Sequence, residues 1–177
     1  MDLIDKELIE NFKKGDTKAF SEIFKLYSDK IYNNVLKLGL NHDDALDIVQ
    51  TTFYKLFKNH RQFKGESSLL TYIISISLNE VRKRYRNEKR YVDLENEEIF
   101  SDEEKINEEK RVRRLKEVVN KGLKKLPYKY REVIVLKDID GLSIQEIKKM
   151  LRISESTVKT RLHRARKILK DLIKDEI

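Results

Sequence analysis

The side chains best suited to binding chemistry gather in residues 156–167, near the end of the chain. Apolar residues recur there at helical spacing, and hydroxyl and cationic side chains surround them. A helix fits the major groove of DNA, where Arg and Lys can read guanine and where Ser and Thr can contact bases or phosphates. We expect base contacts from Ser156, Thr157, Thr160 and Arg161, and phosphate contacts from Lys159, Arg164 and Lys167. The alternative is a basic helix packed against an acidic protein.

A second set of cationic, aromatic and polar side chains lies in residues 72–90. Helical spacing places them roughly along one face: Tyr72, Asn79, Arg82, Lys83, Arg86 and Arg90, with Tyr85 nearby. Phosphates need positive charge and unpaired bases stack on flat rings, so such a face suits a single nucleic-acid strand. Tyr72 fits the edge of a hydrophobic core equally well, and a run of cations is also typical of solvent-exposed surface.

Acidic and hydrogen-bonding side chains form a third set in the segment before these. They point away from the apolar stripe of their predicted helix: Asp43, Asp44, Asp47, Gln50, Thr51 and Tyr54. This face could dock a basic partner helix, or it could be plain solvent surface. The residues alone do not choose between the two.

No set of residues predicts catalysis. His42, His60 and His163 lie far apart in the sequence, and none has the spacing of a metal site or a catalytic triad. The chain contains no cysteine, which excludes disulfides and thiolate metal ligands. A glycine-rich phosphate loop is also missing. The sequence therefore predicts a protein that is not an enzyme, with no cofactor and no metal.

The distribution of charge predicts where a polyanion binds. The chain carries a formal net charge of +8, which divides into +4 for residues 1–92, −8 for residues 93–109 and +12 for residues 110–177. Basic regions on both sides of an acidic segment suggest that a polyanion is met in two places. Solvated helix faces would give the same charge pattern.

The start of the chain and its apolar segments predict its compartment. Residues 1–5 are acidic and lack the basic and apolar regions of a secretory signal. The most apolar stretch, residues 69–78, is far shorter than the roughly 20 residues that span a bilayer. We therefore expect a cytoplasmic protein without membrane insertion.

The elements that must position these side chains are all predicted to be helices, since the chain has only one proline and five glycines. We expect two small helical domains, residues 1–92 and 110–177, joined by a flexible acidic linker, residues 93–109. The 17 residues of that linker could reach about 56–61 Å if extended. In the first domain, two core-facing helices carry Phe20, Ile23, Phe24, Tyr27 and Ile31, and then Ala45, Ile48, Val49, Thr52, Phe53, Leu56 and Phe57. A third helix begins near Ser67 or Ser68, continues to about Tyr91 and buries Leu70, Ile73, Ile74, Ser77 and Val81.

The second domain has the pattern of a helix-turn-helix. Its first helix presents Leu115, Val118, Val119, Gly122 and Leu123, and Pro127 then suits the start of the next helix. Ser143 and Glu146 have the spacing of a capping box that begins a further helix. After a turn at Arg152-Ile153, Ser154 can cap the last helix, whose apolar side holds Val158, Leu162, Ala165 and Leu169.

Together these segments resemble the extracytoplasmic-function (ECF) group of bacterial RNA polymerase sigma factors. The resemblance lies in DDALDIVQTTF at residues 43–53, FKGESSLLTY at residues 63–72 followed by Asn79, Leu126-Pro127, REV at residues 131–133, DGLS at residues 140–143 with Glu146-Ile147, and TVKTRLHRAR at residues 157–166. These motifs cover nearly the whole chain in order, and their combination is far more specific than a helix-turn-helix alone.

The resemblance implies a transcription initiation factor whose partners are bacterial core RNA polymerase, promoter DNA and an anti-sigma factor. It implies that the polymerase clamp helices are bound by Asp44, Asp47, Gln50, Thr51 and Tyr54. It also implies that the −10 element is captured and melted by Lys64, Ser67, Ser68, Tyr72, Asn79, Arg82, Lys83 and Arg86. The −35 element is recognised by Ser156, Thr157, Lys159, Thr160, Arg161, Arg164 and Lys167.

The sequence departs from the pattern of this group at four positions. Tyr72 stands where the group usually has Trp, Lys148 replaces a usual alanine, and Arg152 and Ser156 replace usual glycines. We expect Lys148 to point its ammonium outward and Arg152 to bear strain if its turn needs a positive φ.

Three other functions compete with this interpretation. A conventional helix-turn-helix regulator would bind its operator without polymerase. An enzyme acting on nucleic acid would need the carboxylates or metal ligands that are missing, and a helical scaffold would leave the capped basic helix unexplained.

Overall fold

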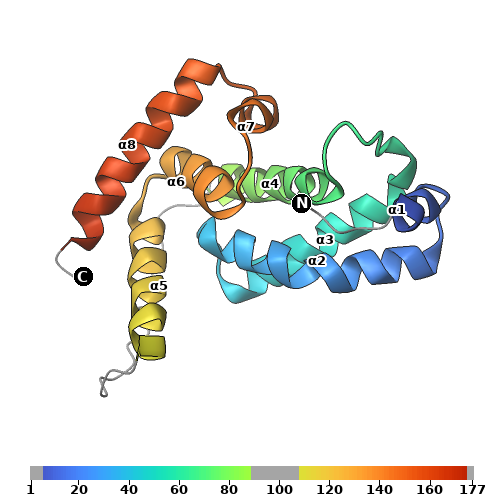
Figure 1. Cartoon of the computed structure of the whole chain (residues 1–177), viewed down its shortest axis with the longest axis horizontal. Helices are drawn as coiled ribbons and strands as arrows, with labels where there is room; N and C mark the ends of the chain where they lie inside the picture. Colours follow the sequence, from blue (N-terminus) through green and yellow to red (C-terminus); the bar gives the residue numbers. More distant parts are fainter. Residues whose placement is uncertain (1–5, 89–107, 175–177) are drawn as a thin grey trace.

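The computed structural model describes residues 6–88 and 108–174, and all of its regular elements in these ranges are helical (Figure 1). This confirms the predicted all-helical class. None of the helices in the described ranges is both long and apolar enough to cross a membrane. The predicted linker falls almost wholly on residues 89–107, and it lies outside the described residues together with Arg90 and Tyr91.

The N-terminal part contains the three predicted helices and one more. The elements are α1 (Lys6–Lys13), α2 (Thr17–Lys37), α3 (His42–Lys58), the short 3₁₀ turn η1 (His60–Gln62) and α4 (Leu69–Glu88). Side chains fix where they begin: Asp16 accepts hydrogen bonds from the amides of Lys18 and Ala19 at the start of α2, and Asn41 accepts one from Asp44 at the start of α3. Helix α1 was not predicted, yet its Phe12 is fully buried.

The core of this part confirms most of the predicted apolar positions. All five residues predicted to be buried on α4 are buried, including the polar Ser77, whose hydroxyl donates to the carbonyl of Ile74. Phe24 was predicted to face the core but is 41% exposed, although its ring packs against that of Phe53 with ring centroids 4.8 Å apart. Its spacing on α2 put it at the edge of the apolar stripe, where the core no longer covers it.

The C-terminal part contains α5 (Glu108–Lys125), α6 (Tyr128–Ile134), a wider π turn η2 (Val135–Ile139), α7 (Ile144–Leu151) and α8 (Glu155–Ile173). Helix α5 begins just before the predicted domain start at residue 110 and crosses α8 closely at Gly122, where a Cβ would lie 2.6 Å from Ile173. Leu115, predicted on the buried side of α5, is instead 36% exposed.

Local signals fix the helix-turn-helix. Ser143 and Glu146 form the predicted capping box at the start of α7, and Ser154 accepts from the amide of Thr157 at the start of α8. Arg152 adopts the left-handed conformation, with φ 55° and ψ 46°, while its amide donates to the carbonyl of Lys148. Since a side chain at this φ costs more than glycine does, the turn is strained as expected. Lys148 is exposed, as its long stem requires.

The N-terminal and C-terminal parts pack against each other and share one continuous hydrophobic core. Figure 1 shows α6 lying beside α4, between the N-terminal helices and the α5–α8 pair. Arg131 on α6 crosses the boundary, where its Nη1 donates to the carbonyl of Leu38 and to the hydroxyl of Tyr85. Gly39 permits this approach, because a Cβ there would lie 1.7 Å from Arg131 Nη1. The sequence did not predict this packing.

Candidate nucleic-acid interface

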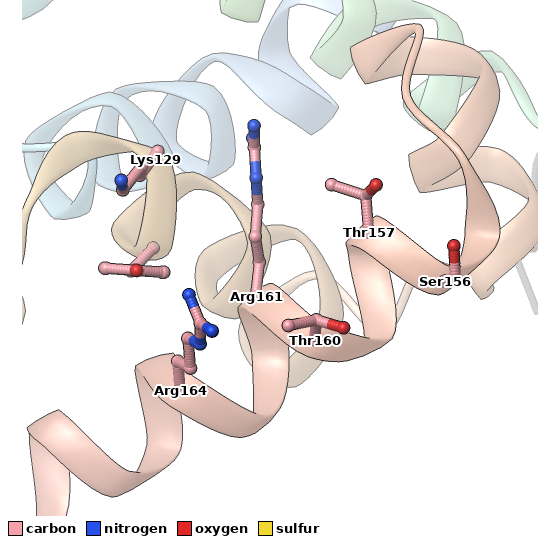
Figure 2. A pocket seen from close by; sticks show the side chains of 7 residues that line it. Lys129, Ser156, Thr157, Thr160, Arg161 and Arg164 are labelled. Carbon is pink, nitrogen blue, oxygen red and sulfur yellow. The ribbon is translucent and has the colours of Figure 1, made fainter.

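A shallow hollow lies between the start of α6 and the exposed face of α8. Five of its lining residues were predicted as DNA contacts, and two from α6 were not (Figure 2): Ser156, Thr157, Thr160, Arg161 and Arg164, with Lys129 and Tyr130. The fold therefore brings together most of the predicted −35 set on one surface. Lys159 and Lys167 are exposed but do not line the hollow.

The first turn of α8 carries a cluster of hydroxyl groups. The Ser154 hydroxyl lies 2.8 Å from that of Ser156 and 2.7 Å from that of Thr157. Since Ser154 also accepts from the amide of Thr157, at 3.1 Å, the cluster is held by the capping interaction itself. These hydroxyls can reorient to donate or accept, which suits contacts to base edges or phosphates.

Lys129 and Tyr130 extend the cationic surface from α8 onto α6. The ammonium of Lys129 lies 5.1 Å from the centre of the Tyr130 ring. A hydrogen bond from Arg164 lowers the pKa of Tyr130, so the α6 tyrosine and the α8 arginine are in contact. The helix start at Pro127 predicted that both residues lie in a first turn, but no sequence signal showed which side of that turn faces α8.

Arg161 is held by a partner inside the protein. Its Nη1 donates to Glu132 Oε1 at 3.2 Å, and Figure 2 shows its side chain extended away from the α8 backbone. The other oxygen of Glu132 accepts from Arg82, at 2.9 Å from Nη2 and 3.1 Å from Nε. The Glu132 side chain is only 4% exposed. Desolvation raises its pKa, although the two arginines oppose this effect.

The predicted −10 residues lie along α4 and the loop before it. Five of them are exposed: Lys64, Ser68, Asn79, Lys83 and Arg86. Ser68 also acts as the cap of α4, since its hydroxyl accepts from the amide of Thr71 at 3.0 Å. Ser67 and Arg82 are partly buried.

Tyr72 occupies a position between core and surface. It is partly buried, and its ring lies 5.2 Å from that of Phe63. Desolvation raises its pKa. Both the stacking role and the core-edge role therefore remain compatible with its position, so its contact with DNA stays a prediction.

The predicted polymerase-binding residues lie on α3. Asp47, Gln50 and Tyr54 are exposed, whereas Thr51 is partly buried and Asp44 pairs with Arg84 of α4. Leu46 and Tyr54, which lie two turns apart, are 48% and 62% exposed. An apolar and an aromatic side chain among acidic and amide groups make this face chemically suited to a protein partner.

Comparison with known proteins assigns a family to each part of the chain. Residues 23–91 match the Sigma-70 region 2 family, and residues 117–169 match the Sigma-70, region 4 family. Over 99% of this chain and 100% of the relative, it is 34% identical to the ECF RNA polymerase sigma factor SigW of Bacillus subtilis (strain 168).

Two solved structures share the fold. The sigma factor RpoE of Bartonella quintana, in a complex with the anti-sigma factor NepR, is 26% identical, with a TM-score of 0.67 over 89% of this chain and 98% of that one. CnrH, in a complex with the cytosolic domain of CnrY, is 24% identical, with a TM-score of 0.68 over 98% of this chain and 99% of that one. With the two family matches and the full-length relative, these findings confirm the resemblance seen in the motifs. The chain belongs to the ECF RNA polymerase sigma factors.

Proposed function

We propose that this sigma factor binds promoter DNA and core RNA polymerase through three surfaces, each on a different helix. Helix α8 holds −35 duplex, α4 holds the separated −10 strand and α3 docks core RNA polymerase. The observation that carries the proposal is the hollow between α6 and α8, where five predicted DNA contacts meet on one cationic surface. Because the family initiates transcription and breaks no bond itself, the surfaces act by binding alone.

At the −35 element, the proposed contacts come from both sides of the hollow. Helix α8 enters the major groove, with Ser156, Thr157, Thr160 and Arg161 near base edges. Arg164 and Lys167 contact phosphates, as does Lys159 once it leaves Glu155, its ion-pair partner at 2.6 Å. Lys129 and Tyr130 add a phosphate contact from α6, because they line the same hollow without belonging to the recognition helix.

At the −10 element, the exposed cations of α4 hold the backbone while Tyr72 stacks on an unpaired base. Flipping a base costs a few kcal/mol, and a surface that binds it outside the stack favours the open strand without ATP.

On this proposal, residues 1–92 and 110–177 act as two domains joined by the acidic segment 93–109, in the cytoplasm where polymerase works. An anti-sigma partner is proposed because the similar RpoE of Bartonella quintana was solved with one.

Transcription with purified bacterial core polymerase tests this function. Adding the chain should produce discrete transcripts from genomic templates, and polymerase without the chain should produce none of them. Tight operator binding and repression without polymerase would favour a conventional regulator. The sequences upstream of the mapped starts would also define the −35 and −10 elements.

A further inference from the structure

Two arginines assigned to different promoter elements share one buried carboxylate. Arg82 on α4 and Arg161 on α8 bind opposite oxygens of Glu132 on α6, at 2.9 Å and 3.2 Å. Removing either partner from a buried carboxylate leaves charge uncompensated, so the three side chains stabilise one another in this arrangement.

Promoter geometry excludes this arrangement in an initiating complex. The −10 and −35 elements are about 25 base pairs apart, and at about 3.4 Å for each base pair they are separated by roughly 85 Å. Two side chains that meet on one carboxylate cannot contact both elements at once. The two parts of the chain must separate before Arg82 and Arg161 reach DNA.

We propose that Glu132 is an internal latch, which keeps this sigma factor in a closed resting state by holding one cation from each DNA-binding surface. This inference rests on the proposed function for the roles of the two arginines. Other contacts across the same boundary also stabilise the closed state. Asn34 of α2 donates to Asp140 at 2.5 Å, Thr71 of α4 donates to Glu146 at 3.3 Å, and the Tyr85 and Tyr128 rings lie 4.4 Å apart.

The latch withholds Arg161 rather than the whole of α8. The predicted phosphate contacts Lys159, Arg164 and Lys167 stay exposed in the closed state, whereas the predicted base contact of Arg161 is withheld. When α4 leaves, Glu132 gains water on the side that Arg82 covered. An exposed pair is worth little, so Arg161 can then exchange Glu132 for a base. The closed chain should therefore discriminate between duplex sequences less well than the open chain does.

A like-charge substitution opens the latch without touching a proposed DNA contact. N34D places a carboxylate opposite Asp140, whereas N33D adds the same charge at the exposed neighbouring position. The double variant N34D/D140N keeps one carboxylate and one amide in reversed positions, so it should close again. Circular dichroism checks that each variant keeps its helix content.

Fluorescent labels measure the separation directly, because the chain has no native cysteine. Cysteines replace exposed Glu22 on α2 and Lys170 on α8, and energy transfer is recorded on the free, full-length chain at about pH 8. We expect one high-transfer population for the parent, for N33D and for N34D/D140N, and a new low-transfer population for N34D. A parent chain that is already open, or N34D that stays closed while folded, would overturn the latch.

Binding to DNA then tests whether Glu132 withholds Arg161. The probes are a duplex with the −35 region of a mapped promoter and its scrambled counterpart. A ligand binds more weakly when only a fraction of the protein is competent, so N34D and E132Q should each raise the preference for the −35 duplex at least about fivefold. Unchanged preference in an opened N34D would refute the proposal. Failure of the parent chain to direct transcription would instead refute the proposed function, since the label experiment uses no DNA.

Discussion

Asn34 Nδ2 donates a 2.5 Å hydrogen bond to Asp140 Oδ2, which joins α2 to the turn after η2. Burial raises the pKa of Asp140 to about 6, despite the opposing effects of Asn34, Lys30 and Lys37. The Asn34 side-chain oxygen has no hydrogen-bond partner among the described residues. The hydrogen bond therefore joins the N-terminal part to the C-terminal part, and it does so at a site where burial disfavours the ionised form of Asp140.

This contact predicts how stability depends on pH. A carboxyl group whose pKa is higher in the folded state favours folding below its unfolded pKa, and it loses that contribution as pH rises through the folded value. We expect the loss between about pH 4 and pH 6, amounting to at most about 3 kcal/mol. Urea denaturation of the parent and D140N should show D140N gaining relative stability across this window. Parallel stability profiles would contradict the assignment.

Replacing Arg161 and Lys159 should have different effects on −35 binding. R161A should weaken binding by about 1–3 kcal/mol and relax sequence preference at one position, because it removes a base contact. K159A should weaken all duplexes alike and lower the salt slope by about one. Fluorescence anisotropy with holoenzyme over a salt series separates the two. Equal loss of preference in both variants would contradict the assigned roles.

Lys129 should behave as a phosphate contact on α6. K129A should lower the salt slope of duplex binding by about one and leave base preference unchanged. Lys121 on α5 is also exposed but does not line the hollow, so K121A provides a matched control. If K121A and K129A changed the slope equally, the effect would come from net charge alone.

Tyr72 should affect strand separation and leave −35 recruitment intact. Stacking on an unpaired base is worth about 1–3 kcal/mol, so Y72A should reduce open complexes on duplex promoters. A template with a pre-melted −10 region should partly restore initiation. Permanganate footprinting reports the open region, and Y72F provides a control that keeps the ring. Normal opening by Y72A would assign Tyr72 to the edge of the core.

The exposed acidic and amide groups of α3 should contribute to polymerase binding. The double variant D47A/Q50A should be recovered less well in a pull-down with core polymerase, while its helicity stays unchanged because both side chains are exposed. E22A, at an exposed acidic position on α2 outside the proposed surface, is the control. Equal recovery of the parent and D47A/Q50A would remove these two residues from the interface.

Local structure was predictable because it depends on neighbouring residues. The capping box at Ser143 and the cap at Ser154 each follow from a few consecutive positions, whereas strain at Arg152 was expected only from the glycine that the sigma factor group usually has there. The two misplaced apolar residues, Phe24 and Leu115, show the limit of this approach. Helical periodicity predicts which face is apolar, but it does not predict how far the opposing surface extends over that face.

The sharing of Glu132 was not predictable in this way. Arg82 and Arg161 were assigned to separate surfaces because their helices carry separate cationic faces. Glu132 lies 50 positions from Arg82 and 29 from Arg161, and nothing in its local pattern indicates which side chains it pairs with. Its role appears only when α4, α6 and α8 are placed together.

We expect Arg131 to couple the unfolding of the N-terminal part to that of the C-terminal part. Besides the two contacts across the boundary, its guanidinium donates to the carbonyls of Leu123, Lys124 and Leu126. One buried side chain thus hydrogen-bonds to the end of α5, to the segment that leads into α6 and to the residue that follows α2. Heat absorbed in melting the N-terminal helices should therefore appear in the same calorimetric peak as that of the C-terminal helices. Lysine has three donors and no planar fork, so R131K should split this peak into two.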